Sequence, residues 1–379
     1  MAEAATVTLV FFVLLVSYAA LTGVRIAAAL IFLTRARVQA GDARDLTILQ
    51  PILSGDPALE GCLAANLAAT PETRFIWLID ENDAEGRRIG EKLKRANVTI
   101  MLGPPPADGE NPKVAKLARA LPQVTTAHFA VLDDDTMLPP GGAAEAIGAL
   151  RDGDLATGLP LYVNRATIWS RLVTAFVNGA ALITYPPGAL MGAQRTINGM
   201  FYVGRTDDLR ALGGFDAIRT TLTDDYAMAK LYLNAGKRLV QTRVVHPIST
   251  TVESAARYWG IMRRWMIFAA RYVRENVSLF TLLVIGAPTF LPLVLLVSAL
   301  FAGLDALLWL GCALFAKAAL TAALRRALAD EPIRALDIAF EIAADLLTPI
   351  HYVRAALSSR RFQWRSRAMR MDGETIRYE

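Results

Sequence analysis

Acidic side chains stand at three places where an apolar run ends or a helical stretch begins. Asp80 follows one apolar run, the triplet at 133–135 follows another, and Asp224 and Asp225 open a helical stretch. A carboxylate just past a strand is also a common capping device, so any one of these groups alone admits a structural interpretation. The triplet is different, because three adjacent carboxylates repel one another and such crowding suits a divalent cation. Magnesium typically takes one or two protein carboxylates together with substrate phosphates.

Short apolar runs alternate with helical stretches in the region that carries these residues. The expected strands are 46–53, 74–79, 98–102 and 128–132, and the expected helices are 56–70, 84–96 and 113–121. This alternation predicts an α/β fold with a mostly parallel, Rossmann-like sheet covered on both faces. Such sheets bind ligands at the carboxyl ends of their strands. The sequence contains neither a GxGxxG motif nor a Walker A motif, so a dinucleotide site or a P-loop has no local support.

Two long apolar tracts account for much of the 54% apolar composition. Residues 6–33 are almost unbroken apolar residues with Arg25 as the one charge, and residues 277–324 form a tract about twice the ~20 residues that cross a bilayer. The first tract lacks a basic n-region and a cleavage site, so we expect an anchor and not a signal peptide. The second tract predicts crossings at 278–300 and 304–324, joined by a turn at 303–305. The total expected is three crossings.

Two further helical stretches carry charge in a regular pattern. Between 252 and 275, Arg257, Arg264 and Arg271 recur every seven residues, while Trp and Met residues gather on another face. This pattern predicts a helix in the membrane interface, with an amphipathic core helix as the alternative. Between 336 and 353, acidic residues at four-residue spacing would be costly in lipid, which favours an interfacial or re-entrant helix; these are Asp337, Glu341 and Asp345.

Basic residues cluster at the boundaries of the apolar tracts and in the tail, within a net charge of +5. Since cytoplasmic flanks carry the Lys/Arg excess, we expect the middle domain and the tail on the cytoplasmic side; the residues concerned are Arg35, Arg37, Arg325, Arg326, Arg360, Arg361, Arg365, Arg367 and Arg370. No basic, aromatic-interleaved face supports nucleic-acid binding. Two distant cysteines and three scattered histidines support neither a disulfide framework nor a zinc site.

The collinear order of these motifs resembles an inverting glycosyltransferase with the GT-A fold. Finer features resemble the ceramide glucosyltransferase family, which is glycosyltransferase family 21, and indicate a bacterial member. The motifs that carry the resemblance are Asp80, Asp133-x-Asp135, Gly213-Gly-Phe-Asp216, Thr223-Asp-Asp225, Arg264-Trp265, Pro51-x-Leu53-x-Gly-Asp-Pro57, Gly109-Glu-Asn-Pro-Lys113, Gly158-Leu-Pro160, Asn198-Gly-Met200 and Asp225-Tyr-x-Met-Ala-Lys230.

The resemblance implies a donor site that binds a UDP-sugar together with Mg²⁺ or Mn²⁺. Asp80 would contact the uracil and ribose, and Lys113 would lie near the nucleotide. Asp133 and Asp135 would hold the cation and the diphosphate. A cation placed where a nucleoside diphosphate leaves would stabilise the negative charge that develops there.

The resemblance also implies the catalytic residues. Asp225 would be the general base that deprotonates the acceptor hydroxyl, and Arg264 and Trp265 would close over the diphosphate. One position departs from the family pattern, since Ile261 stands where the last motif opens with Gln or Arg. The candidates on the acceptor side are Asn198, Gly199, Gly214, Asp216 and Asp224.

The expected reaction is transfer of one sugar, glucose in the first place, from a UDP-sugar to the primary hydroxyl of ceramide or a similar membrane lipid. The nearest alternative is transfer of an N-acetylhexosamine to phosphatidylethanolamine, as in hopanoid-producing bacteria, a group that shares a tail similar to Phe362-Gln-Trp-Arg365. A processive polysaccharide synthase needs more crossings to enclose its product, and a non-catalytic scaffold would not need every acidic motif.

The expected organisation places the enzyme in a bacterial inner membrane with its catalytic domain in the cytoplasm. The segments are an anchor at 1–37, a GT-A domain at 38–251, an interfacial helix with the Arg-Trp motif at 252–276, two transmembrane helices at 277–325, and an interfacial or re-entrant helix with a basic tail at 326–379.

Overall fold

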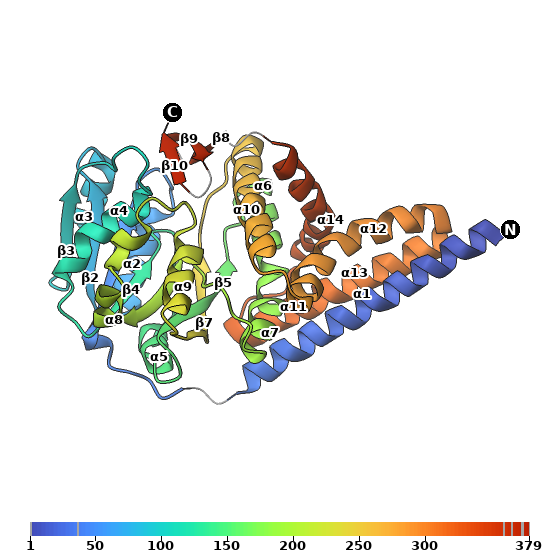
Figure 1. Cartoon of the computed structure of the whole chain (residues 1–379), viewed down its shortest axis with the longest axis horizontal. Coiled ribbons are helices and arrows are strands. Elements are labelled where there is room, and N and C mark those ends of the chain that lie inside the picture. The colour runs from blue at the N-terminus through green and yellow to red at the C-terminus, as the bar shows by residue number, and fades with distance from the viewer. Residues whose placement is uncertain (1, 36–37, 359–360, 365–366, 373–374, 379) are drawn as a thin grey trace. The chain divides into compact units, whose positions relative to one another are not determined.

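The structure is a computed structural model that describes residues 2–35, 38–358, 361–364, 367–372 and 375–378 (Figure 1). Its contacts divide the chain into two compact units. The sheet unit comprises Ala36–Val163, Gln194–Thr251 and Ser359–Glu379, and the helical unit comprises Met1–Arg35, Asn164–Ala193 and Val252–Ser358. Each unit therefore contains segments that are far apart in the sequence.

The sheet unit is built on a seven-stranded sheet with the strand order β3-β2-β1-β4-β6-β5-β7. β6 runs antiparallel to its neighbours β4 and β5, whereas the other neighbouring strands pair in parallel. The strands are β1 (Leu46–Ile52), β2 (Arg74–Asp80), β3 (Val98–Gly103), β4 (His128–Leu132), β5 (Leu155–Tyr162), β6 (Phe201–Arg205) and β7 (Leu239–Ile248). The predicted mostly parallel α/β fold is confirmed.

Alternate residues of each strand enter two different cores, as the two-residue period of a strand requires. In β2, Phe75 and Trp77 pack into one core, and Ile76 and Leu78 pack into the other. The first core includes residues of α2 (Leu59–Ala69), α3 (Ala84–Leu93) and α5 (Gly142–Ala149). The second includes residues of α4 (Pro112–Ala120), α8 (Thr206–Ala211) and α9 (Asp224–Asn234). The sheet is therefore covered by helices on both faces, as predicted.

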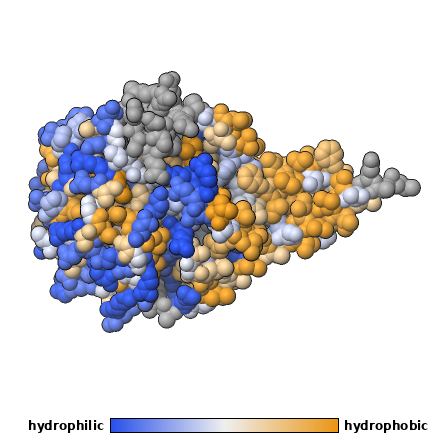
Figure 2. All heavy atoms as spheres, viewed as in Figure 1, coloured by the Kyte–Doolittle hydropathy of each residue, from blue (hydrophilic) through white to orange (hydrophobic). Residues whose placement is uncertain are grey.

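The helical unit contains three helices long and apolar enough to cross a membrane among the residues described. These spans are Ala5–Thr34, Leu279–Ala302 and Leu304–Ala329. The first span belongs to α1 (Ala2–Thr34) and the third is α13 (Leu304–Ala329). The second consists of three consecutive elements, α11 (Leu279–Thr281), η5 (Leu282–Gly286) and α12 (Ala287–Ala302). Figure 2 shows hydrophobic side chains over their surface. The predicted turn between the last two spans is present, where Gly303 has a φ of 102°.

Residues 164–193 lie in the helical unit, although the sequence analysis places them inside the 38–251 segment. They form α6 (Ile168–Asn178), η3 (Ala181–Ile183) and α7 (Tyr185–Leu190). The physical reason is visible in α6, whose Trp169 ring lies 5.7 Å from that of Tyr258 in α10 (Ala255–Glu275). In addition, Arg25 of α1 donates hydrogen bonds to the carbonyl of Ile183 and the hydroxyl of Thr184.

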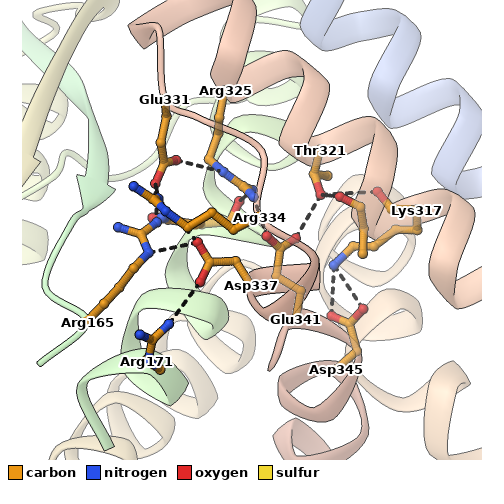
Figure 3. Close-up of polar contacts among 12 residues, drawn as sticks. Arg165, Arg171, Lys317, Thr321, Arg325, Glu331, Arg334, Asp337, Glu341 and Asp345 are labelled. Atoms are coloured by element: carbon orange, nitrogen blue, oxygen red, sulfur yellow. Dashed lines mark hydrogen bonds and ion pairs between the residues drawn. The ribbon is translucent and has the colours of Figure 1, made fainter. Parts of the chain in front are cut away.

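The acidic stripe of α14 (Ala335–Leu357) is neutralised inside the helical unit (Figure 3). Asp345 receives both of its ionic contacts from Lys317 Nζ at 2.9 Å. Glu341 pairs with Arg325 and accepts a hydrogen bond of 2.9 Å from Thr321. The sequence analysis expects these carboxylates to be incompatible with lipid, and the structure shows how burial against α13 satisfies them.

The third acidic residue of the stripe joins α14 to the segment before α6. Asp337 lies 2.7 Å from Arg165 Nε and 3.5 Å from Arg171, and Arg165 also pairs with Glu331. Glu331 in turn lies 3.1 Å from Arg325 Nε. Together these ion pairs form a network that connects α13, α14 and the start of the 164–193 segment, three parts of the chain that are separate in the sequence.

The C-terminal tail forms a three-stranded antiparallel sheet that the sequence analysis does not predict. Its strands are β8 (Arg361–Trp364), β9 (Arg367–Asp372) and β10 (Thr375–Tyr378). Arg37, Arg360 and Arg365, which belong to the predicted basic clusters, lie outside the described residues.

We expect the Glu341→Gln substitution to destabilise the protein by about 2 kcal/mol, because it removes a buried carboxylate charge paired with Arg325 and leaves Arg325 with Glu331 as its acidic partner. Thermal unfolding of the detergent-solubilised protein, followed by circular dichroism, measures the effect. Asp330→Asn is the matched control, since the Asp330 side chain is 90% exposed in its pair with Arg326. Equal melting temperatures for the two variants would contradict a stabilising role for the network.

Candidate functional site

The carboxyl edge of the sheet brings together the acidic motifs of the sheet unit. Asp80 is the last residue of β2, and Asp133 directly follows β4, two strands away across β1. The backbone N–H of Asp133 donates to the carbonyl of Met200, which precedes β6. Since β6 runs antiparallel to β4, its amino end lies at this same edge, and the 198–200 segment joins the site there.

Lys113 connects the second and third acidic motifs. Its ammonium lies 2.6 Å from Asp133 Oδ1 and 3.1 Å from Asp224 Oδ2, and it donates to the carbonyl of Gly199 at 2.7 Å. The Lys113 side chain is only 14% exposed. The sequence analysis places Lys113 near the nucleotide, which stays a prediction, and it predicts neither the contact with Asp133 nor the contact with Asp224.

The amino end of α4 is locked in place by Asn111. Its side-chain oxygen accepts from the backbone N–H groups of Lys113 and Val114, and its amide donates to the carbonyls of Thr221 and Leu222. The Asn111 side chain therefore caps the helix that carries Lys113 and connects that helix to the loop before Asp224.

The three carboxylates of the triplet point to different partners. The side chain of Asp134 is buried and accepts from the backbone N–H of Leu53 at 2.8 Å, so it has a structural role. Asp133 carries the Lys113 contact, and Asp135 accepts from the hydroxyl of Thr250 at 2.5 Å. The cation-binding role of Asp133 and Asp135 stays a prediction, and the contact of Asp134 with the backbone of Leu53 agrees with its place outside that pair.

Asp225 lies against the backbone of Gly199. A Cβ on Gly199 would stand 3.0 Å from the Cβ of Asp225 and 3.4 Å from its Oδ2, which leaves little room for a side chain there. Burial raises the pKa of Asp225 to about 6, and the neighbouring charge of Asp224 adds to this effect. The backbone N–H of Tyr226 and the charge of Lys113 act in the opposite direction.

The charges around Lys113 also shift the other groups of the site. Burial lowers the pKa of Lys113, but the carboxylates of Asp133 and Asp224 outweigh burial and raise it well above its usual value. Burial raises the pKa of Asp133, Lys113 opposes this effect, and Asp135 adds to it. Lys113 is therefore protonated at neutral pH, and burial is the main reason that the pKa of Asp133 is raised.

Asn198 faces inward, whereas the sequence analysis proposes it for the acceptor side. It is 6% exposed, its side-chain oxygen accepts from the backbone N–H of Met200, and it lies 3.2 Å from Nε2 of His246. Burial lowers the pKa of His246 to about 3, so this imidazole is neutral. The pair holds the turn that supplies the carbonyl groups of Gly199 and Met200 to the site.

Asp80 is buried at the end of β2 beside a second lysine of α4. Its Oδ2 lies 3.3 Å from Lys116 Nζ, while Lys116 also donates to the carbonyl of Ile52 at 2.7 Å. A shallow hollow next to this pair is lined by residues of β2, β3 and α4, among them Leu102, Gly103, Lys116 and Arg119. Asp83, three residues after Asp80, caps α3 by accepting a hydrogen bond from the backbone N–H of Gly86 and so has a structural role.

The Gly-Gly-Phe-Asp motif forms a turn before α9. Gly213 and Gly214 have φ values of 88° and 66°, which favour glycine, and Phe215 is fully buried against Phe129. Asp216 is 64% exposed and lies 2.8 Å from Arg219. These contacts explain the motif as a turn, and a role of Gly214 or Asp216 toward an acceptor stays a prediction.

Arg264 and Trp265 lie on α10, in the helical unit. The Trp265 ring stacks on Phe176 of α6 with centroids 5.8 Å apart. The predicted role of both residues at the diphosphate stays a prediction, as does the effect of Ile261 on the same helix.

Two residues of the site, His246 and Thr250, stand in or after an ordinary strand and carry no recognisable sequence signal. Asn111 does carry one, since it lies in the Gly109-Glu-Asn-Pro-Lys113 motif and precedes a proline as a helix cap does. Lys116 follows Lys113 by one helical turn, and this spacing was the one available indication that both lysines face the sheet edge.

Comparison with known proteins places the chain in a family. No curated protein matches the chain. Similar solved structures include a mannosyltransferase from Pyrobaculum calidifontis in complex with GDP-mannose and Mn²⁺, with 17% identity, 90% of this chain and 99% of that chain covered, and a TM-score of 0.46. Another is the glucosyl-3-phosphoglycerate synthase from Mycobacterium tuberculosis with Mn²⁺, UDP and phosphoglyceric acid, with 11% identity, coverage of 59% and 77%, and a TM-score of 0.36. The profile of glycosyl transferase family 21 matches residues 9–376, so the chain belongs to this family.

Proposed function

We propose that this glycosyltransferase transfers a single sugar from a UDP-sugar to the primary hydroxyl of ceramide or a ceramide-like membrane lipid. Glucose is the expected sugar, and the transfer inverts the configuration at the anomeric carbon. The observation that carries the proposal is the convergence of Asp133, Lys113 and Asp225 at the carboxyl edge of the sheet. Membership in family 21 supports glycosyl transfer.

Asp225 is proposed as the general base. In an inverting displacement the acceptor oxygen attacks the anomeric carbon, the bond from that carbon to the diphosphate oxygen breaks, and the hydroxyl proton passes to a carboxylate. Asp225 is a half-buried carboxylate whose raised pKa makes it a stronger base than an exposed aspartate. The proton later leaves Asp225 for water, which regenerates the base.

The donor is proposed to lie along the edge from Asp80 to Asp135. Asp80, at the end of β2, would contact the uracil and ribose. Arg264 and Trp265 would close over the diphosphate. These assignments follow the family resemblance, and the place of Asp80 at the carboxyl end of a parallel strand supports the first of them.

The acidic pair suits a divalent cation that also binds substrate phosphates. The described residues contain no group of three or more His, Cys, Asp or Glu side chains arranged for a metal ion. Mg²⁺ and Mn²⁺ need only one or two carboxylates when phosphates complete the coordination. Asp133 and Asp135 are close enough for the charge of one to raise the pKa of the other. They would hold the ion, which when bound offsets the negative charge of the leaving diphosphate.

A lipid acceptor is proposed because the chain carries three helices suited to a membrane. A two-chain lipid leaves the bilayer at a cost of ~0.8 kcal/mol for each CH₂ group, so an enzyme acting on it gains by residing in the membrane. A UDP-sugar is soluble, and the basic flanks support a catalytic unit on the cytoplasmic side of an inner membrane.

We expect Asp225→Asn to abolish sugar transfer, by a factor of about 10³ or more, because asparagine cannot accept the proton. UDP binding, measured by calorimetry on the full chain, should persist within about threefold of the wild-type affinity. Asp216→Asn is the matched control, since Asp216 is exposed and paired with Arg219. Unchanged turnover in the Asp225 variant would remove the residue from the role of base.

We expect the rate of transfer at saturating substrate to fall below pH ~6, because the base acts only when ionised and burial raises the pKa of Asp225 to about 6. The acid limb should move to lower pH in Asp224→Asn, since the Asp224 charge contributes to the raised pKa. A pH–rate profile of both proteins tests this. An acid limb at the same pH in both would show that another group controls it.

The substrates are tested by incubating the purified full-length protein with a panel of UDP-sugars and two acceptors, ceramide and phosphatidylethanolamine. We expect a mono-glycosylated ceramide in the mass spectrum of the lipid products, with UDP-glucose the preferred donor. A glycosylated phosphatidylethanolamine would replace the proposed acceptor, and a polymer ladder would replace single transfer by processive synthesis.

A further inference from the structure

The ammonium group of Lys113 occupies a position between two acidic motifs. It contacts Asp133 Oδ1 at 2.6 Å, Asp224 Oδ2 at 3.1 Å and the carbonyl of Gly199 at 2.7 Å. Asp133 is also one of the two carboxylates proposed to hold a divalent cation. The protein's own cation is therefore already paired with a carboxylate that the metal ion would use.

The frame around Lys113 is rigid, whereas its side chain is long. Asn111 fixes the start of α4 to the carbonyls of Thr221 and Leu222, just before Asp224. The side chain of Lys113 has four rotatable methylene groups, and two of its three partners do not involve Asp133. Release of Asp133 would leave the ammonium paired with Asp224 and hydrogen-bonded to the carbonyl of Gly199, so the Lys113 charge keeps an acidic partner.

We propose that Lys113 is an exchangeable internal cation. Its ammonium is released from Asp133 when a divalent cation and a nucleoside diphosphate bind together. This exchange makes the binding of the two ligands cooperative. The inference rests on the proposed cation site. Two cations on one carboxylate repel each other, so a bare metal ion binds against Lys113. The negative diphosphate offsets the charges of both cations, so each ligand favours the other by the same factor.

The test is the affinity of the full-length protein in nanodiscs for Mn²⁺, measured by electron paramagnetic resonance with and without saturating UDP. In Lys113→Met, which keeps an unbranched side chain slightly shorter than lysine but loses the charge, the Kd for Mn²⁺ alone should fall about tenfold, because the competing ammonium is gone. With UDP present the Kd should not fall. The factor by which UDP tightens Mn²⁺ binding should therefore shrink in the variant.

Lys116→Met is the matched control, because Lys116 is also a buried lysine of α4 paired with an aspartate but does not contact Asp133. Its Kd for Mn²⁺ alone should equal that of the wild type within about twofold. Asp224→Asn gives a second, independent variant if Lys113→Met does not fold. It leaves Lys113 dependent on Asp133, so Mn²⁺ alone should bind more weakly and the effect of UDP should grow.

The outcomes separate the inference from the proposed function. Mn²⁺ binding that depends on UDP to the same degree in wild type and in the folded Lys113 variant would overturn the exchange and leave the cation site standing. A Kd for Mn²⁺ alone that rises in Lys113→Met would show that Lys113 supports the site without competing for it. Absence of Mn²⁺ binding to the wild type with UDP would overturn both the cation site and the exchange.

Discussion

Like charges at close range are the constraint on which the sheet unit depends. Asp133, Asp224 and Asp225 lie at one edge of the sheet, where the charge of Asp224 helps to raise the pKa of both Asp133 and Asp225. Lys113 supplies a cation there from a helix whose start is fixed by Asn111. The edge can therefore hold acidic residues for chemistry while remaining folded without a ligand.

The helical unit solves the same problem in the opposite way. There the carboxylates of α14 form ion pairs with lysine and arginine side chains from α13 and from the segment before α6. The acidic charges of α14 are therefore paired within the unit. Loss of one partner of such a buried pair is costly, since an unpaired buried charge is far less stable than a paired one. The network links α13 to α14, and α14 to the segment before α6.

The strands could be predicted from the sequence because their apolar runs are short and punctuated. The expected strand at 128–132 coincides with β4, and the expected strand at 98–102 is one residue shorter than β3. Family membership was likewise predictable, because the acidic motifs occur in a fixed order along the chain. These features depend on local pattern, and local pattern is what a single sequence contains.

Features that depend on distant partners could not be predicted. Residues 164–193 follow β5 directly, and only their contacts with α10, α14 and α1 show that they belong to the helical unit. Asn198 belongs to a polar motif, and only the buried His246 beside it shows that the side chain faces inward. The acidic residues of α14 suggested an interfacial position, and their basic partners on α13 could be identified only in three dimensions.

The pairing of α13 with α14 has a consequence for how the protein enters the membrane. α13 emerges from the ribosome first, and it carries Lys317 and Arg325 at positions that are buried in the finished protein. Their carboxylate partners Asp345 and Glu341 are synthesised later. Until α14 is synthesised, Lys317 lacks its acidic partner Asp345, and Arg325 has Glu331 but not Glu341. A chain truncated before residue 335 therefore leaves the Lys317 charge without its carboxylate, which makes α13 more costly to place in lipid.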